Sequence, residues 1–312
     1  MTTWKLTIKP ESESGFDAFK FCKDNSLLGV GWAHAYESDQ PGNIVRAKEL
    51  VEGKYKKWPY PIKHLLEDVK TGDHIWIHKD GKYYLCKAED KILFGKQIND
   101  NFLEYDLGHA RKAKWVEVPE IYVSGTIQRG TIAQRMIQRI KITDKEQDFH
   151  EYLFDNLSKN PEWRIKFDDS VFEKKVSSVS IEDLFNLMSP DDFEDVVAAY
   201  LQDKGWILVK STCFKSKPVF EFSMVNKKHE VGYVQVKSGK SPNPLPPSNY
   251  EKYISNNTLV FLFSTHPTPY PGELVNGVKP ISHDEMFSWI KENAWALPPS
   301  LKARLWYFLI NS

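Results

Sequence analysis

The residues best suited to chemistry lie close together in the last third of the sequence: Glu221, Gln235 and Lys237. A carboxylate can bind a divalent cation such as magnesium, and an ammonium group can orient water or stabilise developing negative charge. Hydrolysis of a phosphodiester needs a cation that neutralises the phosphate and lowers the pKa of the attacking water. These residue types therefore predict a hydrolytic site, provided that they share one face of the fold.

Two strand-like segments joined by a turn are expected to position these side chains. The alternation of apolar and polar residues favours a register in which Phe222 lies opposite Val234. This register puts Glu221 opposite Gln235, and Lys237 two residues further along the same face. The apolar residues expected to meet the core together are Phe220, Phe222 and Met224 on the first strand, and Val234 and Val236 on the second.

A helix is expected to precede the strands and to supply a second carboxylate. Ser189 can cap it, with Pro190 at the first helical position, where the missing N–H donor costs nothing. The residues with the spacing of an apolar helix face are Phe193, Val196, Val197, Tyr200 and Leu201. Glu194 borders this face and is expected to lean toward the sheet. Glu194 and Glu221 together would form an oxygen-rich site suited to magnesium.

Four features follow one another: Phe193-Glu194, a strand at Gly205-Trp206, an acidic residue on the next strand, and Gln235-Val236-Lys237. This order resembles the PD-(D/E)xK superfamily, in particular the Mrr-like restriction endonucleases, which carry Gln-x-Lys in place of Asp/Glu-x-Lys. The resemblance covers about residue 180 to the C-terminus.

The resemblance implies a restriction-endonuclease-like mixed sheet flanked by helices. It also implies catalytic roles for Glu194, Glu221, Gln235 and Lys237, with Glu194 and Glu221 as ligands of Mg²⁺, or of Mn²⁺ as a substitute, and a cut DNA strand as the product. One position departs from the family pattern, because Glu221 stands where most members have aspartate.

The first part of the chain has the pattern of a mostly β domain. The strand-like segments are 4–8, 28–32, 74–78, 82–88, 114–118 and 122–127, and one helix is expected at about 44–54. Asp80-Gly81 separates two of the strands and is a strong signal for a two-residue hairpin turn. A β-barrel or an open sheet follows from this pattern.

Many aromatic residues lie on or beside these strands. Most such residues build a core, but aromatics at the mouth of a small barrel can also stack an extruded base. The Gly-Val-Gly-Trp, Gly-Asp-His-Ile-Trp-Ile and Tyr-Tyr strands, and Trp115 followed by Gly125-Thr126-Ile127-Gln128-Arg129, resemble the PUA-like group that includes the EVE and YTH domains. The resemblance covers about residues 1–142 and implies a pocket for a flipped base. The expected contacts with the base are Trp32, Trp76, Tyr84 and Trp115.

Basic side chains outside these strands are candidates for contacts with nucleic-acid phosphates. Arg129 and Arg135 lie in a basic run after the last strand-like segment, and Lys240 follows the Gln-x-Lys motif. Such runs are more often solvated surfaces, so the phosphate role is an additional hypothesis.

The length and composition agree with two domains in one soluble chain. The 312 residues are 41% hydrophobic and 27% charged, which excludes a disordered or fibrous protein. The expected division is a PUA-like β-barrel at 1–142, a linker with a short helix at 143–179 and the nuclease domain at 180–312, an α+β or α/β organisation. Lys+Arg and Asp+Glu are both 42, so any phosphate-binding face must be local.

Three cysteines without a C-x-x-C pair favour a reducing compartment and argue against a structural zinc site. The N-terminus lacks the pattern of a signal peptide, and no apolar run is long enough to span a membrane. These observations predict a cytoplasmic protein without a membrane partner.

Joining a base reader to a nuclease predicts a modification-dependent, type IV-like restriction endonuclease that defends against foreign DNA. It would flip a modified base, such as methylated or hydroxymethylated cytosine, and cleave double-stranded DNA with magnesium. Cutting both strands needs two nuclease domains, so a homodimer is expected. Two alternatives are a non-catalytic nucleic-acid-binding protein with a decayed nuclease fold, and an RNA-directed nuclease.

Overall fold

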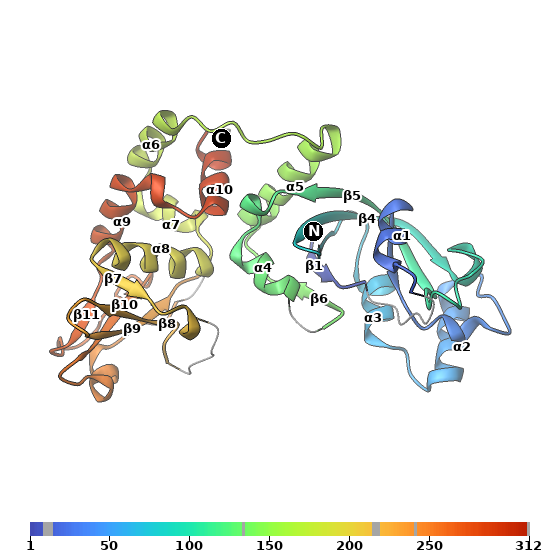
Figure 1. Cartoon of the computed structure of the whole chain (residues 1–312), viewed down its shortest axis with the longest axis horizontal. Helices are drawn as coiled ribbons and strands as arrows, with labels where there is room; N and C mark the ends of the chain where they lie inside the picture. Colours follow the sequence, from blue (N-terminus) through green and yellow to red (C-terminus); the bar gives the residue numbers. More distant parts are fainter. Residues whose placement is uncertain (9–14, 133–134, 214–218, 240–241, 311–312) are drawn as a thin grey trace. The chain divides into compact units, whose positions relative to one another are not determined.

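The computed structural model describes residues 1–8, 15–132, 135–213, 219–239 and 242–310. Its internal contacts divide the chain into two compact units, Met1–Arg164 and Ile165–Ser312 (Figure 1). Each unit contains one mixed sheet with helices. The division falls within the stretch expected as a linker, and the helices on either side of it belong to different units.

The first unit is built on a six-stranded sheet with the order β2-β5-β4-β3-β1-β6. The β1–β3 pair is parallel and the other pairs are antiparallel. Its elements are β1 (Thr3–Leu6), α1 (Ala18–Asp24), β2 (Leu27–Val30), α2 (Ile44–Tyr55), α3 (Tyr60–Lys63), β3 (His74–Lys79), β4 (Lys82–Phe94), β5 (His109–Val118), α4 (Gly125–Ile132), β6 (Ile137–Ile140) and α5 (Asp144–Lys159).

The hairpin between β3 and β4 forms where the sequence predicts it. Asp80 and Gly81 have φ values of 51° and 74°, the left-handed pair that a tight hairpin turn needs, and Lys79 pairs with Lys82. The expected helix at 44–54 is also present as α2. Among the described residues, however, the strands form an open sheet with β2 and β6 at its edges, and they do not close into a barrel.

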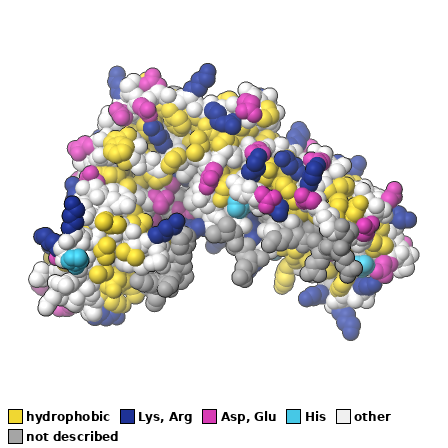
Figure 2. Space-filling model, viewed as in Figure 1, with side chains coloured by type: hydrophobic (Ala, Val, Ile, Leu, Met, Phe, Trp, Pro, Cys, Tyr) yellow, Lys and Arg dark blue, Asp and Glu magenta, His cyan; other side chains and the backbone are white. Residues whose placement is uncertain are grey.

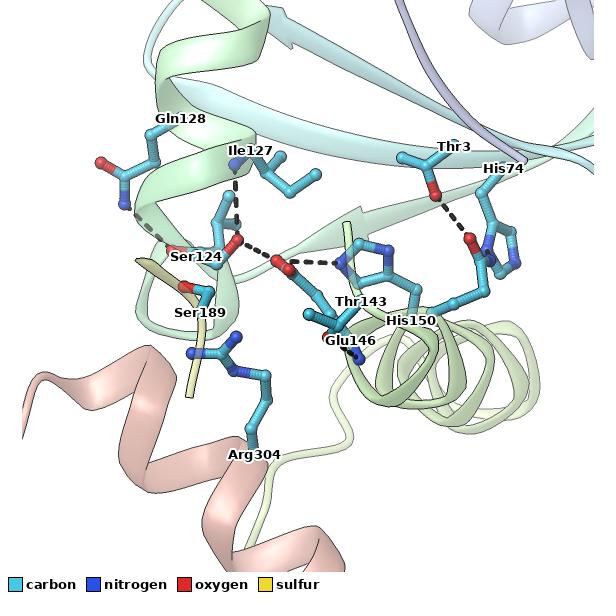
Figure 3. Close-up of polar contacts among 12 residues, drawn as sticks. Thr3, His74, Ser124, Ile127, Gln128, Thr143, Glu146, His150, Ser189 and Arg304 are labelled. Atoms are coloured by element: carbon cyan, nitrogen blue, oxygen red, sulfur yellow. Dashed lines mark hydrogen bonds and ion pairs between the residues drawn. The ribbon is translucent and has the colours of Figure 1, made fainter. Parts of the chain in front are cut away.

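The segment expected as a strand at 122–127 is a turn and the start of helix α4. The Ser124 hydroxyl accepts a hydrogen bond from the backbone N–H of Ile127 at 3.3 Å and donates to the buried carboxylate of Glu146 on α5 (Figure 3). This side-chain cap satisfies a helical N–H that a strand would have paired with a neighbour. The last strand of the sheet is instead β6, which pairs with β1.

Helix α5 covers part of the first sheet and is fixed to it by polar contacts. Thr143 caps the helix, and its buried face includes Phe149, Leu153 and Leu157. Gln147 accepts from the Thr3 hydroxyl at 2.7 Å, and its amide lies 2.6 Å from Nδ1 of His74 on β3 (Figure 3). The helix therefore belongs to the first unit rather than to a free connector.

The second unit contains a five-stranded sheet with the order β11-β10-β9-β8-β7. Strands β7, β8 and β9 are antiparallel neighbours, whereas β10 runs parallel to both β9 and β11. Its elements are α6 (Asp169–Ser178), α7 (Ile181–Leu187), α8 (Pro190–Asp203), β7 (Trp206–Leu208), β8 (Phe222–Asn226), β9 (Val231–Lys237), a 3-10 helix (Pro247–Tyr253), β10 (Thr258–Ser264), β11 (Val278–Pro280), α9 (His283–Glu292) and α10 (Pro299–Ile310).

The two faces of this sheet pack against different elements. Helices α8, α9 and α10 gather on one face (Figure 1), where they enclose a core with Phe222, Met224, Val234 and Val236. The other face packs with the 3-10 helix and forms a smaller apolar cluster. The members of that cluster are Phe220, Leu245, Tyr250, Val260, Leu262 and Val278.

Phe220 does not share a face with Phe222, as simple alternation predicts. Strand β8 begins only at Phe222, and the chain bends at Glu221 just before it. Phe220 therefore reaches the other side of the sheet, where its ring stacks on Tyr233 with centroids 4.8 Å apart. The period-two rule fails here because it applies only inside a regular strand.

The start of α8 is the one that the sequence predicts, because Ser189 caps it and Asp192 completes the capping box. Ser180 caps α7 in a similar way. Among the described residues, none of the helices combines the length and hydropathy that crossing a lipid bilayer requires.

Candidate active site

The β8–β9 hairpin brings together the three residues that the sequence singles out. Phe222 lies opposite Val234, which confirms the expected register. The Oε1 atom of Glu221 accepts hydrogen bonds from Nε2 of Gln235 at 3.0 Å and from Nζ of Lys237 at 3.2 Å. The carboxylate, the amide and the ammonium group thus lie on one side of the sheet, which is the geometry that the hydrolytic hypothesis requires.

The three side chains differ in their access to solvent. Gln235 is only 2% exposed, whereas the side chains of Glu221 and Lys237 are 29% and 44% exposed. The Gln235 amide also donates to the carbonyl oxygen of Val236 at 3.1 Å, so it is fixed from both sides. Gln235 is therefore a buried, fixed side chain that orients the Glu221 carboxylate. The charged groups of Glu221 and Lys237 remain accessible to a ligand.

Strand β10 adds polar groups at the end of the site. It runs parallel to β9, and this pairing places Ser264 beside Lys237. The Ser264 hydroxyl donates to the carbonyl of Asn243 at 3.0 Å, and the Ser264 carbonyl lies 2.6 Å from Nε2 of His283. The sequence does not reveal these neighbours, because parallel pairing joins segments that lie far apart in the chain.

Tyr250, on the 3-10 helix, is a further neighbour that the sequence did not reveal. Burial raises the pKa of its phenol, and the negative charge of Glu221 adds to this effect. The phenol thus stays neutral, and it lies close enough to the Glu221 carboxylate to interact with it electrostatically. Because Tyr250 comes from a proline-rich stretch without a regular pattern, no periodicity in the sequence indicates this proximity.

Glu194, the other expected metal ligand, lies on helix α8 beside Cys213. Burial raises the pKa of the Cys213 thiol, and the negative charges of Asp195 and Glu194 raise it further. Glu194 is half-exposed and follows the buried Phe193, as the helical spacing predicts. The structure therefore joins Glu221, Gln235 and Lys237 directly and holds Glu194 on a separate element.

The oxygen donors at the hairpin suit a hard cation whose coordination is completed by oxygen atoms of the substrate. Magnesium is typically held by one or two carboxylates together with water and substrate phosphate oxygens. Glu221 offers such a carboxylate, with one oxygen held by N–H donors. Within the described parts of the chain, no group of three or more His, Cys, Asp or Glu residues is arranged to hold a metal ion. A cation here would depend on Glu221, with Glu194 as the candidate second ligand.

The four aromatic residues expected to contact a base do not gather in one place. Trp76 is fully buried, and its ring packs against His150 of α5 with centroids 5.1 Å apart. Strand pairing puts Tyr84 and Trp115 on the opposite face of the sheet, where their rings meet edge to face at 6.0 Å. Trp32 lies beyond the end of β2 and packs against the first core. Only Tyr84 and Trp115 are brought together.

The indole N–H of Trp115 is buried without a hydrogen-bond partner among the described residues, and so is that of Trp76. What sets Trp115 apart is the group of aromatic rings around it. Phe19 of α1 lies 5.2 Å from Tyr84 and 5.9 Å from Trp115 between ring centroids, and Nζ of Lys23 lies 4.7 Å from the Tyr84 centroid. This aromatic group with a lysine is the part of the first unit that most resembles the expected base contacts.

The expected phosphate contacts are spread over several elements. Arg129 lies on α4 and Arg135 lies just before β6, and both are exposed. Lys240 lies outside the described residues. Lysine and arginine side chains alternate with acidic ones over the face seen in Figure 2, so no continuous basic surface marks a nucleic-acid path there.

Comparisons of the chain with protein-family models, curated proteins and solved structures find no match. The functional interpretation therefore depends on the geometry of the site and on the motifs in the sequence.

Proposed function

We propose that the chain is a magnesium-dependent deoxyribonuclease of the modification-dependent restriction type. The observation that carries the proposal is the meeting of Gln235 and Lys237 at the Glu221 carboxylate. An acid just before β8, with an amide and an ammonium group on the adjacent antiparallel strand β9, forms the arrangement that the Gln-x-Lys motif implies.

The residues of the hairpin would divide the work of phosphodiester hydrolysis. A bound magnesium ion supplies positive charge at the scissile phosphate and lowers the pKa of a nearby water. Glu221 would hold that ion and Gln235 would keep the carboxylate in one orientation. The Lys237 ammonium, which is partly exposed, can orient the attacking water or stabilise the negative charge that develops on the phosphate oxygens.

The proposal for the first unit is that it selects the DNA by binding a flipped, modified cytosine. The support is the group formed by Phe19, Tyr84 and Trp115, together with the resemblance to PUA-like domains. Trp76 is left out of this proposal, because its ring is enclosed between β3 and α5. We further propose that the enzyme acts in the cytoplasm as a homodimer, since a double-strand break needs two such hairpins.

A direct test uses phage DNAs that carry unmodified, methylated, hydroxymethylated or glucosylated cytosine, incubated with the full chain and magnesium. We expect cleavage of a modified DNA, and a loss of cleavage of about 100-fold or more in Glu221→Ala and Lys237→Ala, with DNA binding retained. Lys228→Ala is the matched control, because Lys228 is an exposed lysine in the turn of the same hairpin. Unchanged cleavage in both site variants would refute the assignment. A matched RNA duplex tests the RNA-directed alternative.

A second candidate function is a binding protein whose nuclease fold no longer cuts. The observation that favours it is Glu221, which stands where most members of the family that this sequence resembles have aspartate. Calorimetric titration with magnesium and manganese separates the two functions. If neither ion binds to the parent chain and none of the DNAs is cut, but one of them is bound, the result supports the binding function.

A further inference from the structure

We propose a second nucleic-acid contact on the first unit, a stacking platform formed by Tyr60 with Lys56, Lys57 and Lys63. This surface, called the Tyr60 platform below, is separate from the aromatic group around Trp115 and from the β8–β9 hairpin. Its partner is a single-stranded segment of nucleic acid, with one base on the tyrosine ring and the neighbouring phosphates on the lysines.

The Tyr60 ring is presented to solvent in a fixed position. Tyr60 is 74% exposed and stands between Pro59 and Pro61, whose restricted φ angles limit the freedom of the segment. One side of the ring lies on the imidazole of His64, with centroids 6.0 Å apart and planes inclined by 28°. A partner that stacks on the exposed side would therefore order little additional structure.

The support beneath the ring is continuous with the core. The His64 ring also packs against the buried Trp4, with centroids 5.7 Å apart, and its Nδ1 lies 2.6 Å from a carboxylate oxygen of Asp68. These contacts set the orientation of the imidazole and hence of Tyr60. The platform is thus the outer end of a row of three neighbouring rings, in contrast to an isolated surface side chain.

The charged groups near the Tyr60 ring in the sequence are lysines, which are exposed and can contact phosphates. Lys56, Lys57 and Lys63 are exposed, and within the described residues none of them forms an ion pair, whereas the nearby Lys54 is paired with Glu37 at 3.2 Å. The acidic residues that follow are already engaged by ring N–H groups. Trp58 donates to Glu67 at 2.8 Å, and Asp68 holds His64.

An exposed ring among unpaired lysines matches the chemistry of single strands better than that of other partners. A base offers a π face to the tyrosine, and its phosphates offer charge to the lysines. A duplex hides its base faces, so it would leave the ring unused. A lipid surface would require several apolar side chains beside the ring, but the flanking exposed residues here are lysines.

The test is fluorescence anisotropy with a labelled 12-nucleotide oligo-dT and the full chain, in EDTA so that cleavage plays no part. We expect Tyr60→Ala to weaken binding roughly tenfold, the size typical of one stacked base, and Tyr60→Phe to bind within about twofold of the parent. Lys57→Ala combined with Lys63→Ala should reduce the slope of log K against log salt by about 1.4, since each phosphate contact on a single strand contributes about 0.7.

The controls are Ile121→Ala, which removes another exposed apolar side chain of the first unit, and Lys91→Ala combined with Lys96→Ala, which removes two other exposed lysines. Both should bind as the parent does. Parent-like binding by Tyr60→Ala would overturn the proposal, as would an equal change of slope in the Lys91 and Lys96 variant. So would a loss of binding to anionic vesicles in Tyr60→Ala with oligonucleotide binding unchanged, which would identify a membrane surface instead. Because the assay omits magnesium, its result is independent of the nuclease proposal.

Discussion

Two of the ion pairs in the second unit have opposite surroundings. Both oxygens of Asp192 lie 2.6 Å from Nη2 of Arg304, and these side chains are only 3% and 2% exposed. Glu221 and Lys237 lie 3.2 Å apart and are 29% and 44% exposed. The first pair is enclosed and joins α10 to the start of α8, whereas the second can still accept a ligand.

The difference separates a pair that is enclosed within the protein from a pair that remains within reach of a ligand. Asp192 also accepts from the Ser189 backbone N–H and hydroxyl, both at 2.6 Å, so its hydrogen-bonding capacity is used within the protein. At Glu221 the two donors share one oxygen. Breaking an enclosed pair is strongly destabilising because it leaves a buried charge unpaired, whereas a half-exposed pair contributes little to stability and stays accessible to a ligand.

The largest expected effect comes from breaking the enclosed pair. Arg304→Met leaves the buried Asp192 carboxylate without its cation, and we expect a loss of about 3 to 5 kcal/mol in the free energy of unfolding. Lys237→Met should change that free energy by less than about 1 kcal/mol, because its partner is partly solvated. Urea denaturation of the two variants measures both values. Equal losses would show that the two pairs do not differ in the way described.

Two buried histidines of the first unit are expected to make its stability depend on pH. Burial lowers the pKa of His74 and of His109 to about 4, from 6.5. Since the folded pKa lies below the unfolded one, the stability that each neutral imidazole contributes is complete above pH 6.5 and is lost as the pH falls toward 4. Between pH 7 and pH 5 this loss is about 2 kcal/mol for each histidine.

His109→Gln tests this pH dependence. The variant lacks one titrating group, so its free energy of unfolding should fall less between pH 7 and pH 5 than that of the parent. Chemical denaturation at the two pH values gives the comparison. If the parent and the variant lose the same amount, His109 does not titrate as its burial predicts.

The smallest expected effect concerns Gln235, the buried residue of the hairpin site. Gln235→Glu places a second carboxylate about where the amide now donates to Glu221, and like charges raise the pKa of one of them. We expect a loss of about 1 kcal/mol in EDTA, recovered when magnesium is added, and magnesium binding that weakens as the pH is lowered. Thermal unfolding with and without the ion measures this. Gln235→Met, which removes the donor without adding charge, should show no recovery.

The hairpin site could be predicted from the sequence because its determinants are local. Alternation sets the pairing of Phe222 with Val234, and the Ser189 cap sets the start of α8. The same local rules failed at 122–127, where the Ser124 side chain starts a helix in a stretch that resembles a strand. Nor could they find β6, whose partner β1 lies at the other end of the unit.

The aromatic residues of the first unit show why a base pocket is harder to predict than a strand. Residue type alone does not say which face of a sheet is covered, and Trp76 is enclosed because α5 packs over it. Tyr84 and Trp115 share a face only because of the pairing of β3, β4 and β5. Both facts depend on tertiary contacts between distant segments, which a single sequence does not contain.

The bend before β8 places the Glu221 carboxylate outside the regular part of the sheet. Glu221 precedes the strand, and its neighbour Phe220 is held by a stack on Tyr233 instead of by the main core. Changes at residue 220 could therefore shift the carboxylate by small steps without disturbing the rest of the sheet. Such an arrangement lets the position of the carboxylate be adjusted by mutation or by design while the fold stays as it is.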